Sequence, residues 1–350
     1  MIEIDGSVGE GGGQILRTAL SLSLCSGKPF KLTHIRANRS KPGLLRQHMA
    51  CVKAALSISR STATGADLGA TSLTFEPGPI RPGDYAFEIG SAGSCMLVLQ
   101  TVIPPLLAAG GESQVSVIGG THNPKAPPFP FLLRSWIPLV RQLGCELELT
   151  LFRNGFYPAG GGEVECMVRS IAGMLRPFDL TERGKAEDGY LEILAPGLPR
   201  YVSQREHERF MATSGWRDDQ IRRSSVRANE GPGNAMIATL PHANLTTVFS
   251  EIGSKSVMAE TVADRLAGQV RRHHAEEGAL DDHLADQWTL PLTLAVWQSG
   301  RAARYTCTAL TPHAMTNFDI IQRFVPVRIT ATEVRAGLNM VTIDPPAAAD

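Results

Sequence analysis

Apolar residues recur at the spacing of an amphipathic helix in three separate parts of the chain, and short β-type segments lie between these parts. Segments 114–118 and 145–151, for example, have the alternating or β-branched composition of strands. Because helical and strand periodicities alternate along the chain, the pattern predicts a mixed α and β fold. The three helical faces consist of Leu45, Met49, Val52 and Leu56; of Leu132, Trp136, Val140 and Leu143; and of Met258, Val262, Leu266 and Val270.

Two stretches of the chain, residues 35–56 and 118–144, resemble each other loosely. Each contains a strand end, a loop with asparagine, lysine and proline, and an amphipathic helix, which indicates a repeated strand-helix unit. The composition changes near Thr181, where the polar, turn-rich segment ERGKAEDG begins and an Arg-rich region follows. We therefore expect an inserted domain that starts there and ends near Arg272.

Composition excludes several classes of protein. The chain has 350 residues and 43% of them are hydrophobic, which is enough for two ordinary packed domains. Its 34 Lys and Arg balance 34 Asp and Glu, so any site for RNA has to be local rather than a field over the whole surface. The six cysteines include no C-x-x-C pair, which argues against a zinc ribbon, a redox motif or a disulfide framework.

No membrane segment or secretory signal is evident in the sequence. The opening MIEIDG lacks both a basic start and an apolar stretch before a cleavage site, so we expect a cytoplasmic protein. The most apolar window, Cys95 to Ala109, is shorter than a bilayer span and contains Pro104 and Pro105. It is therefore interpreted as a core helix.

The segment GSVGEGGGQILR, residues 6–17, follows an expected strand and opens an expected helix. Its glycines allow backbone N–H groups to approach a phosphate at a helix N-terminus, as in a nucleotide loop. It is not a dinucleotide fingerprint, because Gln14 replaces the third glycine, and the chain has no G-x-x-x-x-G-K-[ST] motif. Glu10 lies between glycines, where a carboxylate beside phosphates suits a divalent cation. A tight turn without any ligand is the alternative.

The segment from Lys31 to Lys53 carries six basic residues and no acidic one. Guanidinium groups match phosphate oxygens in paired geometry, so Arg36, Arg39 and Arg46 are candidate ligands for an RNA terminus. Arg17, at the end of the glycine-rich segment, joins them as a fourth candidate. The alternative is a solvated helix face, although such faces usually mix charges of both signs.

Two further positions suit binding or chemistry. Ser91, Gly93 and Ser94 precede an apolar helix and form a second candidate anion cradle, with Ser94 as an alternative N-cap. His313 lies between an expected strand and a helix that we expect to begin around Thr316. A helix N-terminus nearby would keep the imidazole neutral and steady a transferring phosphoryl group. An ordinary loop histidine is the alternative.

Six motifs occur in order between residue 5 and about residue 328: GEGGGQILR, KPGLLRQH, IGSAGSCMLVLQT, GFYPAGGGEV, LADQ and PHAMTN. Together they resemble RNA 3'-terminal phosphate cyclases. The resemblance implies an α+β fold, with a large domain of three repeated βαβαββ units and a smaller inserted α/β domain. We expect residues 1–181 and 274–338 to form the large domain, 182–273 the insert, and 339–350 a C-terminal tail.

The resemblance also implies an ATP-dependent conversion of an RNA 3'-phosphate end to a 2',3'-cyclic phosphate. His313 matches the family's catalytic histidine, which takes AMP from ATP and passes it to the RNA to give an RNA-ppA end. Glu10 matches a glutamate placed near the triphosphate and a Mg²⁺ or Mn²⁺ ion. The family's ATP-contacting positions fall on Gln100, Pro127, His283, Leu284, Ala285, Asp286 and Gln287.

Two residues depart from the family's usual pattern. His283 stands where a tyrosine is usual, and Pro312 stands where a cysteine often precedes the catalytic histidine. A non-catalytic relative that binds RNA or a ribosome-assembly partner is the competing hypothesis, and the presence of His313 and LADQ argues against it. The fold also resembles enolpyruvyl transferases at a distance, but such an enzyme needs no nucleophilic histidine at that place.

Overall fold

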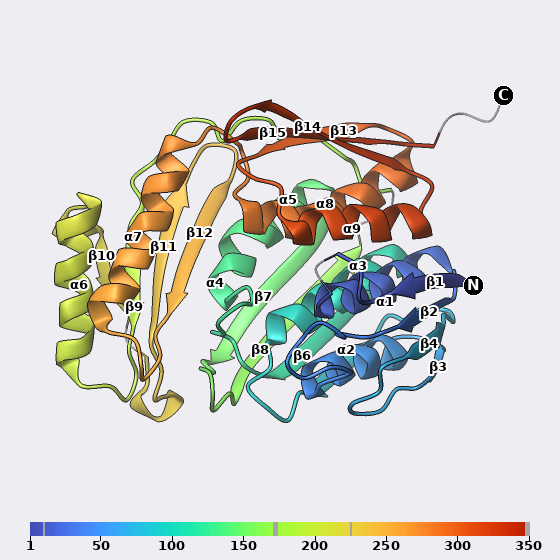
Figure 1. The fold of residues 1–350 in the computed structure, drawn as a ribbon, viewed down its shortest axis with the longest axis horizontal. Coiled ribbons are helices and arrows are strands. Elements are labelled where there is room, and N and C mark those ends of the chain that lie inside the picture. Colours follow the sequence, from blue (N-terminus) through green and yellow to red (C-terminus); the bar gives the residue numbers. More distant parts are fainter. Residues whose placement is uncertain (10, 171–173, 225, 347–350) are drawn as a thin grey trace.

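The strands of the computed structural model, which describes residues 1–9, 11–170, 174–224 and 226–346, form four sheets (Figure 1). The first unit runs strand, helix, strand, helix, strand, strand, and its sheet has the order β1-β2-β4-β3. Its elements are β1 (Ile2–Asp5), α1 (Gly13–Ser26), β2 (Phe30–Thr33), α2 (Arg46–Ser57), β3 (Thr62–Thr64) and β4 (Leu73–Glu76).

The second unit repeats this plan, with its second helix divided into three pieces, and its sheet has the order β5-β6-β8-β7. In both units the first two strands are parallel, as a helical crossover requires, and the last two form an antiparallel pair. The elements are β5 (Asp84–Glu88), α3 (Cys95–Ala109), β6 (Glu112–Gly119), α4 (Phe129–Phe131), the π-helix η1 (Leu132–Trp136), α5 (Ile137–Gln142), β7 (Cys145–Arg153) and β8 (Gly162–Ser170).

The third unit has the same order of elements, but its first strand is reduced to a bridge. Leu180 pairs in parallel with Tyr305, and the remaining strands follow in the order β13-β15-β14. The three repeated βαβαββ units that we expected are therefore present. The elements after the bridge are α8 (Asp282–Ser299), β13 (Ala303–Cys307), α9 (Pro312–Phe324), β14 (Arg328–Arg335) and β15 (Leu338–Asp344).

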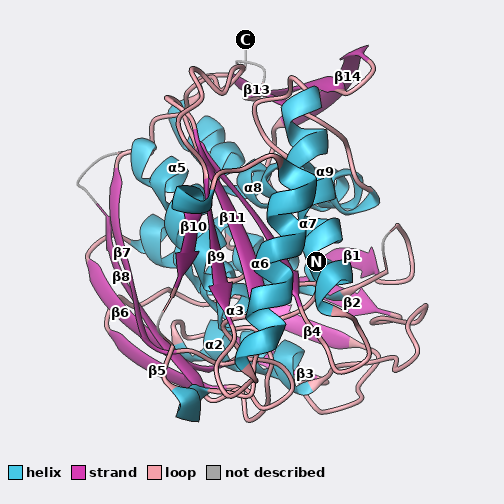
Figure 2. Ribbon diagram, turned by 90° about the vertical axis from the view of Figure 1, so that its left-hand side faces the viewer, coloured by secondary structure: helices cyan, strands magenta, loops and turns pink. Residues whose placement is uncertain are grey.

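A further sheet, of order β10-β9-β11-β12, interrupts the third unit between Leu180 and α8. Helices α6 and α7 cover one of its faces, and a separate apolar cluster lies between helices and sheet (Figure 2). We propose that residues 182–273 are the inserted domain, with α7 ending two residues beyond, at Ala275. Its elements are β9 (Tyr190–Leu194), α6 (Arg200–Ser214), η2 (Asp218–Gln220), β10 (Ile221–Arg223), η3 (Ala228–Glu230), β11 (Ala235–Pro241), β12 (Thr246–Ile252) and α7 (Ala259–Ala275).

The helices of the three units pack against one another, and the three sheets cover them from outside (Figures 1 and 2). Strands β7 and β8 alternate buried and more exposed residues, as expected for antiparallel strands with one face toward the core. Helix α3 is apolar on all sides and largely buried, which confirms its interpretation as a core helix. Within the described ranges, every helix is too short or too polar to cross a bilayer.

The structure corrects two expectations near the C-terminus. Residues 339–344 are not a tail, because they belong to β15, which lies between β13 and β14 and buries Val341 and Ile343. Helix α9 begins at Pro312 and not around Thr316, because Thr311 provides the N-cap and proline fits the first helical position.

The position of β15 generates a stability prediction. Ile343→Ala should lower the free energy of unfolding by about 2 to 5 kcal/mol, because it removes a fully buried side chain from a central strand. Thr342→Ala, on the same strand but half-buried, is the control and should cost less than about 1 kcal/mol. Urea titration of both variants measures the difference. Equal midpoints for wild type and Ile343→Ala would mean that this segment contributes nothing to the core.

Candidate functional site

His313 occupies the second position of α9, directly after Pro312. The side chain of Thr311 caps this helix by accepting a hydrogen bond from the Ala314 N–H at 3.0 Å. The imidazole is thus attached to the first turn of a capped helix, whose N-terminal end carries a partial positive charge. A phosphoryl group beside His313 would lie at the end of the helix that favours anions.

The orientation of the His313 ring depends on Gln14, at the start of α1. Ring atom Nδ1 lies 2.8 Å from Gln14 Oε1. Because an amide oxygen only accepts hydrogen bonds, Nδ1 is the donor in this contact, and a neutral ring then carries its lone pair on Nε2. The tautomer required of a nucleophile attacking through Nε2 is therefore selected by a residue 299 positions away in the sequence.

Three more side chains hold α9 against α1 and α8. The Thr311 hydroxyl donates to Asp286 Oδ1 at 2.8 Å, and the Asn317 amide donates to the Asp286 carbonyl oxygen at 3.3 Å. The Thr18 hydroxyl donates to Asn317 Oδ1 at 2.8 Å within the protein interior. Asp286 is buried, and burial raises the pKa of its carboxyl to about 7 despite the hydrogen bond from Thr311. These contacts set the position of the first turn of α9.

The glycine-rich segment brings a second histidine to this region. Any Cβ at Gly13 would collide with the ring of His48 and the guanidinium of Arg17, so only glycine fits there. His48 is buried and accepts a hydrogen bond from the Leu45 N–H at 3.1 Å. Burial, with smaller effects of Arg17 and Arg36, lowers the pKa of His48 to about 3. His48 is therefore a neutral ring packed under the start of α1.

A cavity of about 50 Å³ lies between α1, α3, α8 and η1, and Asn317 of α9 lines it as well. Gln14, Arg17, Gln100 and Asp286 contribute to its wall. Both polar atoms of the Gln100 amide are buried and lack a hydrogen-bond partner in the described part of the chain. A buried amide in that state is costly unless a ligand or water satisfies it. A void of this volume holds only part of a nucleotide.

The predicted ATP-contacting residues do not all reach this cavity. Gln100, Asp286 and Gln287 line it, whereas the other four do not. Leu284 and Ala285 are fully buried in the core, and the His283 side chain is 71% exposed on the first turn of α8. Pro127 is half-buried on the loop that precedes α4.

The loop that contains Pro127 is anchored against the second anion cradle. Asn123 donates to the carbonyl of Ala92, beside Ser91 and Gly93. Ser94 caps α3, which was the alternative to its role in the cradle, because its hydroxyl accepts from the Leu97 N–H at 3.4 Å. Gln47 of α2 accepts from the Ser94 N–H at 3.4 Å, so the N-terminal ends of α2 and α3 lie together.

The four predicted phosphate-binding arginines differ in their surroundings. Arg36 donates to the carbonyls of Lys41 and Gly43 and so holds its own loop together. Arg46 donates to the Gly90 carbonyl at 2.8 Å and fastens α2 to the loop before α3. Arg17 lines the cavity and Arg39 is exposed. Arg17 thus borders the cavity, whereas Arg39 lies on the surface outside its wall.

The predicted metal ligand, Glu10, lies outside the described residues. Among the residues that are described, no group of three or more His, Cys, Asp or Glu side chains is arranged to hold a metal ion. Carboxylates close to the site are Asp281, an N-cap of α8, and Asp286. Neither of them belongs to a group of three or more potential metal ligands among the described residues.

Sequence reasoning missed several residues that form the site. Gln14 was noted only for interrupting a dinucleotide fingerprint, and His48 only as the last letter of the motif KPGLLRQH. Thr311 and Asn317 were not singled out, although they flank PHAMTN or lie in it. The signal for Thr311 was available, because threonine before proline and an apolar helix is a capping pattern.

Comparison with known proteins gives matches over nearly the whole chain. The model of the RTC family, described as RNA 3'-terminal phosphate cyclase, matches residues 8–331. A curated protein of Ralstonia nicotianae named RNA 3'-terminal phosphate cyclase is 46% identical over 338 residues, which cover 95% of this chain and 94% of the relative. Gln14, His48, Asp286 and His313 lie within the matched range.

The raised pKa of Asp286 predicts a pH dependence of stability. Its pKa in the folded protein, about 7, exceeds the ordinary value of 3.8, so protonated Asp286 favours the fold at low pH and this contribution is lost as pH rises toward 7. Asp286→Asn keeps an acceptor for Thr311 and cannot ionise. Its stability relative to wild type should rise by at least about 1 kcal/mol between pH 4 and pH 8, measured by urea denaturation. Asp319→Asn, on the exposed side of α9, is the control. A stability difference between Asp286→Asn and wild type that does not change with pH would contradict the prediction.

Proposed function

Because this chain belongs to the RNA 3'-terminal phosphate cyclase family, we propose that it uses ATP to convert an RNA 3'-terminal phosphate to a 2',3'-cyclic phosphate through AMP carried on His313. The observation that carries the proposal is the hydrogen bond of 2.8 Å between His313 Nδ1 and Gln14 Oε1. It leaves the ring lone pair on Nε2, at the positive end of α9. The proposed nucleophile, Nε2 of His313, thus lies at the helix end that stabilises anions.

The first step is adenylylation of the protein. Nε2 of His313 attacks the α-phosphorus of ATP, the bond to the β-phosphate oxygen breaks, and pyrophosphate leaves. The product is a phosphoramidate in which Nδ1 still donates its proton to Gln14. The side-chain oxygen of Gln14 aligns the His313 ring before ATP binds. The protein therefore needs little reorganisation when positive charge develops on the imidazole.

The second and third steps take place on the RNA. An oxygen of the RNA 3'-phosphate attacks the phosphorus of His313-AMP, which frees the histidine and gives an RNA-ppA end. The neighbouring 2'-hydroxyl then attacks the 3'-phosphorus, loses its proton and expels AMP, which closes the ring. Both reacting groups of this last step belong to one ribose, so positioning supplies much of its rate.

Gln100 supports a role for the cavity in ATP binding. Its buried amide has a donor and an acceptor without partners in the described part of the chain. A side-chain amide can pair with the donor and acceptor edge of adenine through two hydrogen bonds. Asp286 and Gln287 line the same cavity. His283, exposed on the first turn of α8 and one turn before Gln287, offers a flat ring of the kind that stacks on a base.

A divalent ion, Mg²⁺ or Mn²⁺, is part of the proposal, but the described residues do not form a site for it on their own. Such ions are commonly held by one or two carboxylates together with the phosphates of the substrate. Glu10, outside the described residues, is the carboxylate that the family pattern assigns to this role. When bound, the ion would offset the charge of the triphosphate.

His313→Ala is expected to abolish covalent labelling by ATP that carries ³²P at the α-phosphate, because the imidazole supplies the bond to phosphorus. The same variant should still cyclise pre-adenylylated RNA, since His313 serves only the first two steps. His274→Ala, on the exposed last turn of α7, is the matched control and should label normally. Labelling of His313→Ala at the wild-type level would refute the assignment. Absence of labelling in the wild type would favour a non-catalytic, RNA-binding relative.

Arg39→Ala should weaken binding of RNA with a 3'-phosphate end and reduce the slope of log affinity against log salt concentration by about one. Self-adenylylation should remain near the wild-type level, because Arg39 is exposed and lies outside the cavity wall. Lys53→Ala, also exposed and in the same basic segment, is the control. Fluorescence anisotropy at several salt concentrations provides the measurement, and an unchanged slope would place the phosphate contact elsewhere.

A further inference from the structure

The second helix of the second unit contains a π-helical turn, η1, between α4 and α5. Such turns are rare and occur frequently at functional sites, because they change the direction of the side chains that they carry. Two side chains of η1 make polar contacts with different parts of the protein. Trp136 contacts α8, and Arg134 contacts the inserted sheet.

The contact of Trp136 compensates for a proline in α8. In an α-helix the carbonyl of Gln287 would accept a hydrogen bond from the N–H of residue 291, but that residue is Pro291 and has no N–H. The indole N–H of Trp136 donates to this carbonyl instead, at 3.0 Å. Trp136 is 1% exposed and lines the same cavity as Gln287, Gln100 and Asp286.

The contact of Arg134 joins η1 to the inserted sheet. Its guanidinium pairs with Glu192 of β9 and donates to the Thr239 hydroxyl of β11 at 2.9 Å. The guanidinium also lies 5.4 Å from the ring centroid of Tyr190. The side chains of Arg134 and Glu192 are only 24% and 16% exposed, so water screens this pair less than the exposed ion pairs.

We propose that η1 couples the inserted domain to the cavity lined by Gln100, Asp286 and Gln287, here named the nucleotide cavity. Trp136 is a positioning residue for Gln287, and Arg134 connects η1 to the insert. The inference rests on the proposed function in one respect, that the nucleotide bound in this cavity is ATP. The insert then sets the affinity for ATP without touching it. When β9 moves relative to η1, the hydrogen bond from Trp136 to the Gln287 carbonyl changes. The position of Gln287 in the cavity wall, which ATP contacts, changes with it.

The first test separates the hydrogen bond of Trp136 from its bulk. Trp136→Phe should raise the KM for ATP in self-adenylylation about five-fold or more, with kcat changed less than about two-fold, because the support acts on binding. Trp288→Phe is the matched control, since the buried Trp288 indole N–H donates to no group in the described part of the chain. It loses similar bulk and should leave the KM unchanged.

Restoration of a donor makes the test specific. Pro291→Ala returns an N–H to residue 291, which can donate to the Gln287 carbonyl, so Trp136→Phe should have little effect on the KM in that background. A purely structural role of Trp136 predicts no such rescue. Equal effects of Trp136→Phe and Trp288→Phe, or an undiminished effect in the Pro291→Ala background, would overturn the positioning role.

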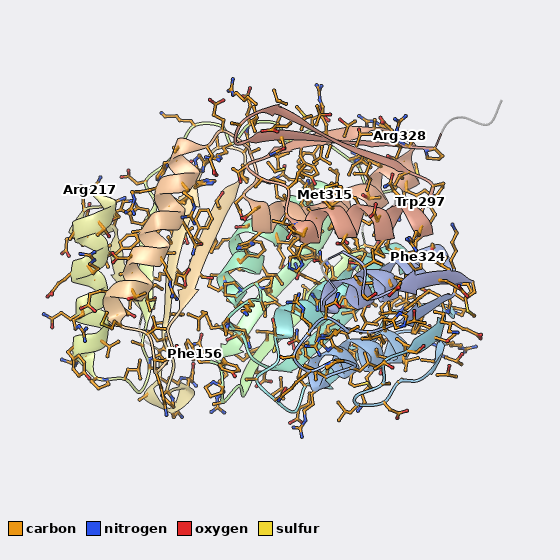
Figure 3. The ribbon with its side chains drawn as sticks, in the orientation of Figure 1. Phe156, Arg217, Trp297, Met315, Phe324 and Arg328 are labelled. Atoms are coloured by element: carbon orange, nitrogen blue, oxygen red, sulfur yellow. The ribbon has the colours of Figure 1, made fainter. Side chains whose placement is uncertain are left out.

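The second test examines the connection to the insert. Glu192→Gln should raise the KM for ATP about three-fold, and adding Trp136→Phe should give less than the product of the two single effects. Asp188→Asn is the control, because it weakens an ion pair with Arg217 that is exposed on the outer side of the insert (Figure 3). An unchanged KM in Glu192→Gln, or strictly multiplicative effects, would overturn the coupling.

Calorimetric titration of ATP into His313→Ala proteins that carry the same changes keeps this inference separate from the proposed chemistry. There the variants should change the dissociation constant by the same factors. Wild-type protein that binds ATP without forming covalent AMP would refute the proposed function and leave the coupling to be judged by binding. Unchanged dissociation constants in Trp136→Phe would refute the coupling while the chemistry stands.

Discussion

The contact between α1 and α9 is the constraint on which the site depends. Thr18 donates to Asn317, and His313 is hydrogen-bonded to Gln14, so the first and third units are joined by two polar contacts across 299 residues of sequence. These contacts decide the tautomer of His313 and the position of its ring. The cap of α9 at Thr311 depends in turn on Asp286, which is held in a buried environment. A shift of α9 relative to α1 would therefore move the His313 ring away from Gln14.

The repeated architecture explains why the site lies where it does. Each unit packs its helices inward beneath an outer sheet, so the helices of different units meet in the interior (Figures 1 and 2). Side chains join the N-terminal end of α9 to those of α1 and α8, and the N-terminal end of α2 to that of α3. Helix N-termini attract anions, and their convergence suits a substrate that carries several phosphates. No single unit contains all the residues of the site, because Gln14, Gln100 and His313 come from three different units.

The inserted domain meets the large one through several contacts, and two of them involve elements near the site. Arg134 on η1 reaches Glu192 and Thr239, and Phe156, labelled in Figure 3 where the two parts meet, packs closely on Gly233. Phe156 also stacks on the buried ring of His122 at 4.9 Å between centroids, and burial lowers the pKa of His122 to about 3. The first contact connects the insert with η1, which borders the cavity through Trp136. The second connects it with the loop that carries His122 and Pro127, which does not line the cavity.

The sequence by itself determined the mixed fold, most of the helical faces and the glycine loop before α1, because periodicity and glycine patterns are local. Leu45 and Met258 are exceptions among the predicted faces, because both are N-caps and Met258 is exposed. Family motifs supplied the repeated units. Sequence reasoning did not place β15, since a short C-terminal segment becomes a central strand only by pairing with β13 and β14. It also could not show that Gln14 orients His313, that Arg36 and Arg46 hold loops, or that Trp136 replaces the missing donor at Pro291. These roles depend on contacts between residues that the tertiary structure brings together, so the packing of the folded chain determines them.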